Sequence, residues 1–421
     1  MPAPDAPRPM DGYRVLDFTQ NVAGPLAAQV LADLGAEVIK VEAPGGEQAR
    51  RVISLLPGRK PLAAYFLPNN RGKKSVVVDL GTAEGVAQVL ALIDGADVLL
   101  EAFRPGVMEK LGLGPEVVRE RNPRVIYARL SAYGGNGPAS GRPGLDLLVQ
   151  AEAGMTTGLR TADGGPQLIP FQLVDGASGH VFAQAVLAAV LNRERHGVAD
   201  VVRVAMYDVA ISLQANQLTL HLNKEPAGAA GSGTEGGGAR RRRKGTAFAA
   251  QPSETFRAAD GFLVLSAYLP RHWQRLTEVI GRPELAADER FADQRLRSVN
   301  FDELKAELES ALAARPAAEW VGLLQAAGLM ATLAYSWKQV VGTALFEENE
   351  LAMTVGAGAD SVRLVRTPAR FDSFGPAATA PPPAAGEHNA ELFGTAGLLG
   401  GGPPQRRPDG VDGMDGAAAG A

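Results

Sequence analysis

Short apolar runs alternate with longer segments of helical periodicity along the first half of the chain. The first run, Tyr13–Phe18, has the β-branched and aromatic character of a strand. The Ala- and Leu-rich segment Leu26–Leu34 follows as a helix, which Gly35 ends, and Glu37–Glu42 is a second strand. Strand, helix and strand within about 30 residues constitute a βαβ unit.

The same alternation recurs as far as residue 205. We expect further strands at Ser75–Asp79, Asp97–Leu100, Val125–Leu130 and Val201–Val204, and helices at Glu84–Ile93, Pro115–Arg121 and Val174–Leu191. This order predicts an α/β fold with a Rossmann-like parallel sheet and helices on both faces. Right-handed crossovers bring the carboxyl ends of the strands to one edge, where ligands bind.

The composition changes beyond this region. Gly228–Gly238 is Gly-rich and Arg240–Lys244 is basic, which is typical of a flexible loop or linker. A strand at Phe262–Ala267 and the charged helical segment that follows it predict a smaller α+β domain. The tail from Gly400 consists of Gly, Pro, Asp and Ala and is expected to be disordered.

Composition and charge narrow the classes of function. The 421 residues are 46% hydrophobic and 21% charged, as in ordinary globular proteins, and the net charge of −4 gives no basic field for nucleic acid. The lone basic run lacks interleaved aromatic residues, so we interpret it as a solvated loop. No cysteine is present, which excludes disulfides, thiolate metal ligands and Cys nucleophiles. The five scattered histidines predict no metal site.

Location is inferred from what the apolar segments lack. Met1–Met10 has no apolar core of a signal peptide. No apolar run approaches the ~20 residues that span a bilayer, and we interpret Phe182–Leu191 as part of a buried helix. We therefore expect a cytoplasmic protein without a membrane partner.

Several motifs follow one another over residues 11–395: Leu31–Glu42 (LADLGAEVIKVE), Asn70–Leu80 (NRGKKSVVVDL), Asp97–Gly112 (DVLLEAFRPGVMEKLG), Gly144–Thr157 (GLDLLVQAEAGMTT), Asp175-Gly176 and Pro383–Asn389 (PAAGEHN). In this order and spacing the chain resembles the family III CoA-transferases, whose relatives include an α-methylacyl-CoA racemase. The resemblance covers nearly the whole chain, whereas any one segment alone would be weak support.

The resemblance implies a catalytic role for Asp175. Its carboxylate would attack a thioester to give a mixed anhydride, and the CoA thiolate would return to give an aspartyl-CoA thioester. A carboxylate is ordinarily ionised at pH 7, so we expect no partner base. Asp175 also lies at a predicted helix start, which favours anions; from the residues alone a plain N-cap is the commoner interpretation, and the resemblance reverses that weighting. Asp146 is a possible supporting group.

The resemblance also implies a track for coenzyme A as substrate and product thioester. The residues that would line it are Val22, Ala23, Val78, Asp79, Leu80, Phe103, Arg104 and Lys110. Arginine and lysine suit phosphates, and phenylalanine suits a flat or apolar partner. The glycines Gly236, Gly237 and Gly238 resemble a mobile loop that would close over the acyl site, with a bare interdomain linker as the alternative.

The family architecture implies a homodimer of two chains threaded as interlocked rings, with a large domain built from both chain ends. Combined with the composition, it divides the chain into 11–205 (large Rossmann-like domain), 206–245 (linker and Gly-rich loop), 246–330 (small domain), 331–398 (return segment completing the large domain) and 399–421 (disordered tail).

Three functions stay open at this level. The first is CoA transfer from an acyl-CoA thioester to a free carboxylic acid. The second is an acyl-CoA racemase, which needs a His-Asp pair where this chain has Leu145-Asp146; leucine cannot move a proton, and this favours transfer. The third is a non-catalytic CoA-binding homologue, which the presence of Asp175 disfavours. The acyl donor and the acceptor acid are not evident from the sequence.

Overall fold

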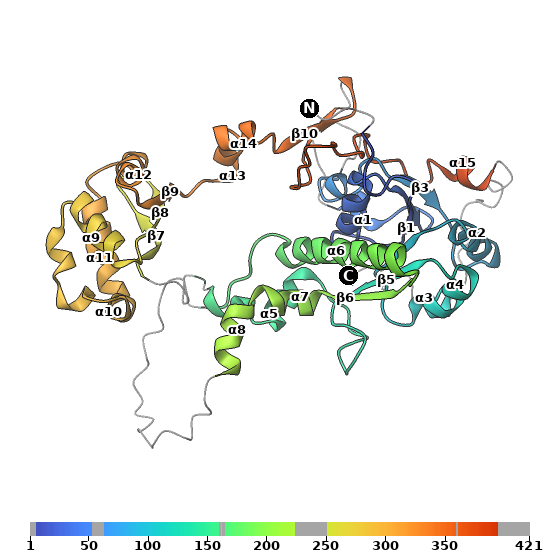
Figure 1. The fold of residues 1–421 in the computed structure, drawn as a ribbon, viewed down its shortest axis with the longest axis horizontal. Coiled ribbons are helices and arrows are strands. Elements are labelled where there is room, and N and C mark those ends of the chain that lie inside the picture. Colours follow the sequence, from blue (N-terminus) through green and yellow to red (C-terminus); the bar gives the residue numbers. More distant parts are fainter. Residues whose placement is uncertain are drawn as a thin grey trace, which may run out of the picture. The chain divides into compact units, whose positions relative to one another are not determined.

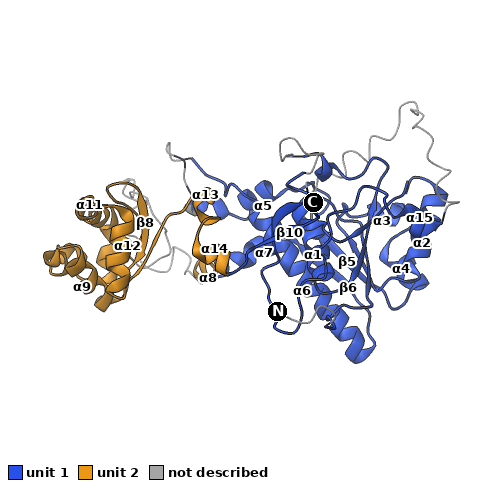
Figure 2. Ribbon diagram, turned by 90° about the horizontal axis from the view of Figure 1, so that it is seen from above, with its two compact units in different colours: residues 1–215, 349–421 blue, residues 216–348 orange. Residues whose placement is uncertain are grey.

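The computed structural model describes residues 6–52, 63–159, 161, 165–223, 251–358 and 361–394. Two compact units divide the chain, with residues 1–215 and 349–421 in unit 1 and residues 216–348 in unit 2 (Figure 2). The glycines Gly236, Gly237 and Gly238 and the expected tail 399–421 lie outside the described residues.

The centre of unit 1 is a parallel sheet of six strands in the order β3-β2-β1-β4-β5-β6 (Figure 1). The strands are β1 (Arg14–Asp17), β2 (Glu37–Glu42), β3 (Lys74–Val77), β4 (Val98–Glu101), β5 (Ile126–Ser131) and β6 (Val201–Ala205). Every pairing between neighbours is parallel. The strand order reverses direction between β1 and β4, which is the arrangement of a doubly wound Rossmann-like sheet.

The helices of unit 1 are α1 (Ala23–Asp33), α2 (Ala83–Ile93), α3 (Val107–Lys110), α4 (Pro115–Arg121), α5 (Asp146–Glu152), α6 (Leu173–His196), α7 (Met206–Leu213) and α15 (Asn389–Phe393). Successive residues of each strand point to opposite faces of the sheet. Val15 joins the core shared with α1 and α6, whereas Leu16 joins the core shared with α2 and α4. Both faces of the sheet are therefore covered, and the predicted α/β class is confirmed.

Helix α6 packs closely on the beginning of α1. A side chain at Gly179 would bring its Cβ to 2.7 Å from the carbonyl oxygen of Ala23 and 2.9 Å from Cβ of Leu26, so only glycine fits. By length and composition α6 could cross a membrane, but half of its most apolar stretch is buried inside the protein. Its buried residues Phe182 and Val186 belong to the core of unit 1.

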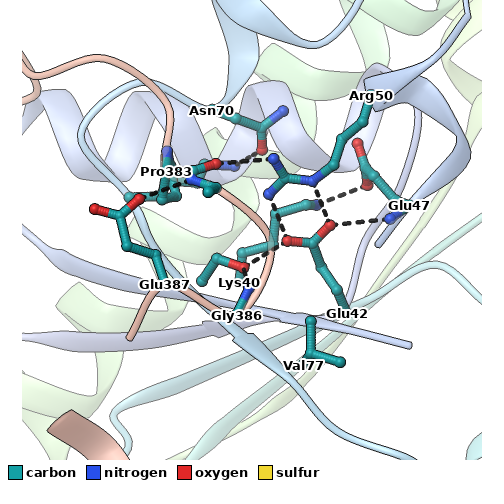
Figure 3. A network of polar contacts seen from close by, with 12 residues as sticks. Lys40, Glu42, Glu47, Arg50, Asn70, Val77, Pro383, Gly386 and Glu387 are labelled. Atoms are coloured by element: carbon teal, nitrogen blue, oxygen red, sulfur yellow. Dashed lines mark hydrogen bonds and ion pairs between the residues drawn. The ribbon is translucent and has the colours of Figure 1, made fainter. Parts of the chain in front are cut away.

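A C-terminal segment returns to the outer strands of the sheet (Figure 3). The Arg50 guanidinium donates to both oxygens of Glu42, at 2.7 and 2.6 Å, and to the carbonyl of Pro383 at 2.8 Å. The Ser75 hydroxyl donates to Glu42 at 2.6 Å and accepts from the N–H of Gly386 at 3.0 Å. One buried carboxylate thus joins β2, β3 and the returning chain.

Side chains of the returning segment also pair with the outer edge of β3. The Asn389 amide accepts from the N–H of Val77 at 2.8 Å and donates to its carbonyl at 2.9 Å. His388 accepts from the N–H of Ser75 through Nδ1 at 3.2 Å. The segment therefore covers an edge that would otherwise expose unpaired backbone groups.

The remaining strands and helices were not all predicted. Unit 1 also contains the antiparallel pair β10 (Ala352–Val355) and β11 (Val362–Val365). The structure contains an antiparallel sheet of β7 (Ser253–Arg257), β8 (Phe262–Ser266) and β9 (Met330–Leu333), with helices α8 (Ala215–Leu222), α9 (Pro270–Val279), α10 (Gln294–Val299), α11 (Phe301–Leu312), α12 (Ala317–Ala326), α13 (Trp337–Val340) and α14 (Ala344–Glu348).

The extents of the units differ in two places from the ranges expected from the sequence. Residues 206–215 belong to unit 1, because Met206 and Ala210 of α7 are buried in its core. Residues 331–348 belong to unit 2, and β9 pairs with β8 there. The remaining division into domains stays a prediction.

Candidate functional site

The residues expected to bind CoA lie at the carboxyl edge of the parallel sheet. Val22 and Ala23 form the beginning of α1 after β1, Val78–Leu80 directly follows β3, and Phe103 and Arg104 follow β4. Because the strands are parallel, these loops emerge at one edge. The edge contains the β1/β4 reversal, where open α/β sheets bind ligands.

These residues differ in what they offer a ligand. The side chains of Ala23 and Val78 are buried in the two cores, so only their backbone groups are available to a ligand. Phe103 and Arg104 are half-buried, and Lys110 is exposed at the end of α3. A partly open aromatic residue followed along the chain by an arginine and a lysine fits a ligand that combines phosphates with a flat or apolar part.

Asp175 is the third residue of α6, and 4% of its surface is exposed. Its Oδ1 has no hydrogen-bond partner among the described residues. Its own backbone N–H donates to Oδ2 of Asp146 at 2.9 Å. The structure thus brings together the two acidic residues that the sequence analysis singled out.

A short hydrogen-bond chain fixes Asp146, the first residue of α5. Gln150, one turn along the same helix, donates through Nε2 to Oδ1 of Asp146. Gln150 in turn accepts from the N–H of Ile169 at 2.9 Å, in the loop before α6. Leu145, which stands at the position of the racemase histidine, is 40% exposed and precedes the helix.

The environment of Asp175 makes it a weak acid. Burial first, and then the negative charge of Asp146, raise its pKa to about 7. The helix dipole acts in the opposite direction, but its ~0.3–1 kcal/mol is smaller than the ~4 kcal/mol that corresponds to such a shift. The expectation of an ordinary, fully ionised carboxylate at pH 7 left burial out of account, and burial raises the pKa of Asp175 into the neutral range.

Tyr65 is a neighbour of this site that was not predicted from the sequence. Burial, followed by the charges of Asp175 and Asp146, raises the pKa of the Tyr65 phenol to about 12. The phenol therefore lies within electrostatic range of both carboxylates and stays protonated at neutral pH. No sequence signal marks it, since a tyrosine in an apolar stretch is typical of ordinary packing.

A cavity of about 880 Å³ opens beside the loop that contains Phe103. Its lining comes from the carboxyl ends of β4, β5 and β6 and includes Phe103, Glu101, Arg129 and Tyr133. Glu101 is 1% exposed. Burial raises the pKa of its carboxylate to about 7, although the positive charge of Arg129 acts to lower it. Neither Glu101 nor Arg129 was predicted from the sequence as a site residue.

Metal chemistry has no obvious ligand set in the part of the chain that the structure describes. Within those residues, no group of three His, Asp or Glu side chains is arranged to hold a metal ion. The chemistry available at the carboxyl edge is that of a buried carboxylate, a phenol and nearby cations.

Comparison with known proteins identifies the family of the chain. A model of CoA-transferase family III matches residues 10–389. The chain is 66% identical over 398 residues to a probable fatty acyl-CoA transferase, Rv3272, of Mycobacterium tuberculosis, covering 93% of this chain and 98% of the relative. It is 32% identical over 407 residues to a succinyl-CoA:mesaconate CoA-transferase of Haloarcula hispanica, covering 92% and 96%.

A solved structure is similar to this chain in both fold and sequence. The orthorhombic crystal form of Rv3272 from Mycobacterium tuberculosis superposes with a TM-score of 0.82 at 63% identity, covering 92% of this chain and 100% of that one. The match of fold and sequence extends over both units. The chain belongs to the family III CoA-transferases.

Proposed function

We propose that this protein moves CoA from an acyl-CoA thioester to a free carboxylic acid, with Asp175 as the residue that carries first the acyl group and then CoA. The observation that supports this most directly is the Asp175 carboxylate, which is buried at the start of α6 with Oδ1 unpartnered among the described residues. A group held in this way is desolvated and available to bond with a substrate carbon.

The first half of the reaction exchanges the donor acid for Asp175. The Asp175 carboxylate attacks the thioester carbonyl, and the carbon–sulfur bond breaks. The CoA thiolate is released, and the acyl group stays on Asp175 as a mixed anhydride. The thiolate then attacks the Asp175 carbonyl carbon of the anhydride. The donor leaves as a free carboxylate, and Asp175 holds CoA as a thioester.

The second half repeats these steps with the acceptor. The acceptor carboxylate attacks the Asp175 carbonyl and displaces the thiolate, which gives a second anhydride. The thiolate attacks the acyl carbonyl of the acceptor, a new acyl-CoA forms, and the Asp175 carboxylate is regenerated. No net proton is consumed, so the reaction needs no general base.

The surroundings of Asp175 influence both steps. A pKa of about 7 makes the ionised carboxylate more basic than an ordinary aspartate, and therefore more nucleophilic. The Tyr65 phenol, which stays protonated, is a donor available to the oxygen that becomes negative during attack. Phe103, Arg104 and Lys110 at the sheet edge are proposed to hold CoA, together with the backbone near Val22, Ala23, Val78, Asp79 and Leu80.

Several further properties belong to the same proposal. We infer a cytoplasmic homodimer, and a role for Gly236, Gly237 and Gly238 as a loop over the acyl site. The relatives' names point to a fatty acid or a dicarboxylic acid as the substrate class, because one is a probable fatty acyl-CoA transferase and another acts on succinyl-CoA and mesaconate.

A single assay tests the proposal. The protein is incubated with a panel of acyl-CoA thioesters and free acids, and exchanged CoA esters are measured by mass spectrometry. Hydroxylamine added during turnover should trap Asp175 as a hydroxamate, detected by peptide mapping. Asp175→Asn should form no exchanged ester and no hydroxamate while still binding CoA. Full transfer by Asp175→Asn would contradict the mechanism.

A further inference from the structure

The loop that contains Phe103 and Arg104 connects β4 to α3 and is neither helix nor strand. It leaves β4 after Glu101, passes through Pro105 and Gly106, and enters the single turn of α3. Gly106 has φ of +88°, a conformation that glycine adopts readily. One backbone hydrogen bond, from the N–H of Val107 to the carbonyl of Arg104 at 3.1 Å, closes the turn, and side-chain contacts at both ends of the loop tie it to the sheet.

At the first end, the buried Glu101 holds the loop directly. Its Oε2 accepts a hydrogen bond from the backbone N–H of Phe103 at 2.8 Å. Its Oε1 accepts from Nε of Arg129 at 2.7 Å. Glu101 and Arg129 are register partners on the neighbouring parallel strands β4 and β5, which explains why their side chains meet.

The same arginine also reaches the other end of the loop. Nη2 of Arg129 lies 2.8 Å from Oε1 of Glu109, in α3 beside Lys110. One guanidinium therefore joins a carboxylate that precedes Phe103 to a carboxylate that follows Arg104. The planar fork of arginine allows two carboxylates to be held at fixed angles, which a lysine ammonium cannot reproduce.

The charges around the cavity make this arrangement sensitive to the loss of one member. Arg203 is the register partner of Arg129 on β6, so a second cation lies alongside. Asp208 also lines the cavity. Removing the Arg129 charge would leave Glu101 buried without its cation, at a free-energy cost that moves the loop or protonates the carboxylate.

We propose that Glu101, Arg129 and Glu109 are positioning residues that fix the loop of Phe103, Arg104 and Lys110 for CoA. This inference rests on the proposed function, and it predicts an effect on the affinity for CoA without an effect on the chemistry at Asp175. A purely structural role predicts a different result, namely a lower melting temperature or a smaller active fraction at unchanged affinity.

The test uses Arg129→Gln, Arg129→Lys and Glu109→Gln in the full chain, with Arg121→Gln as control. Arg121 makes a comparable two-contact pair with Asp94, at 2.6 Å for each contact, and it is exposed in α4 of the same unit. CoA itself is titrated by calorimetry, and kcat and the KM values for the thioester and the acid are measured in the exchange assay.

Arg129→Gln should raise the Kd for CoA and the KM for the thioester roughly tenfold, with kcat and the KM for the acid changed less than about twofold. Arg129→Lys should recover part of the loss, and Arg121→Gln should match the wild type. An unchanged Kd in Arg129→Gln, or a lower kcat at unchanged KM, overturns the inference.

Glu109→Gln keeps the test decisive if Arg129→Gln fails to fold, because Glu109 is exposed and the buried Glu101 keeps its ion pair with Arg129. It should raise the Kd about threefold, and a wild-type value would overturn the inference. If the wild-type protein itself does not bind CoA, the proposed function fails together with the inference. If the wild type binds CoA and the variants bind equally well, only the positioning role is wrong.

Discussion

Oδ2 of Asp146 accepts the backbone N–H of Asp175 at 2.9 Å, so the residue that caps the start of α6 also places a negative charge beside the proposed nucleophile. The two effects on Asp175 are distinct. The hydrogen bond fixes its backbone, while the charge of Asp146 contributes to the raised pKa of its side chain. A substitution that keeps the hydrogen bond and removes the charge separates them.

Asp146→Asn is such a substitution with its amide oxygen toward the Asp175 N–H; its amide nitrogen then faces Nε2 of Gln150, so the hydrogen bond from Gln150 is lost. Without the negative charge, the pKa of Asp175 should fall from about 7 toward its usual value. Activity requires the ionised form, so the acidic limb of the kcat/KM profile should move to lower pH by roughly 0.5–1 unit. The profile is measured between pH 5 and 9, with Asp94→Asn at an exposed site as control. An unshifted limb would show that Asp146 does not tune the nucleophile.

Burial of Asp175 should also reduce the stability of the protein at neutral pH. Its folded-state pKa of about 7 lies above the unfolded value, so the folded protein binds more protons between these two values. Stability therefore decreases as pH rises from about 4 to 7 and stays low above that range. Replacing the carboxylate by an amide removes this penalty.

Asp175→Asn should accordingly be more stable than the wild type at pH 8, by roughly 1–4 kcal/mol, and similar to it at pH 4.5. Urea unfolding at the two pH values measures the difference. Equal stability of the two proteins at pH 8 would mean that the Asp175 carboxylate is better solvated than its surroundings indicate.

Arg104→Ala should weaken CoA binding if the guanidinium contacts a phosphate. The loss of charge-assisted hydrogen bonds should cost about 1.5–3 kcal/mol for each bond, and binding should become less sensitive to salt. Calorimetric titrations at low and high ionic strength measure both effects. A wild-type affinity in the variant would transfer the phosphate contact to Lys110, since Lys74 lies at the amino end of β3 and pairs with Glu37 and Glu391.

The fold was predictable to a large extent because its signals are local. Tyr13–Phe18, Leu26–Leu34 and Glu37–Glu42 have the periodicities of strand and helix, and the structure has β1, α1 and β2 there. The strands β10 and β11 were missed, since they form an antiparallel pair outside the strand–helix–strand alternation from which the parallel sheet was predicted.

The site was predictable only in part because its properties arise from tertiary packing. Asp175 and Asp146 could be named from motifs, but the pKa of Asp175 depends on burial that no motif encodes. Tyr65 approaches both carboxylates through the fold alone. Arg129 is one residue within a strand, and its role becomes visible only when β4 and β5 are paired.

This protein should not racemise 2-methylacyl-CoA thioesters. Lifting the α-proton of a 2-methylacyl-CoA from one face and returning it on the other requires a proton carrier on each face. Asp175 could serve one face. The opposite carrier in the racemase is a histidine, and here Leu145 occupies that position, 40% exposed and without a titratable group. The adjacent Asp146 is engaged by Gln150 and by the backbone N–H of Asp175.

One stereoisomer of 2-methylacyl-CoA, incubated with the protein in deuterium oxide, should therefore keep both its configuration and its α-proton. Mass spectrometry and chiral chromatography measure the two. Addition of a suitable free acid to the same sample should still produce its CoA ester, which establishes that the enzyme is active under these conditions. Rapid deuterium incorporation with inversion would contradict this prediction, because it requires a working proton carrier on each face of the substrate. Loss of that exchange in Asp175→Asn or Asp146→Asn would place this chain with the racemases.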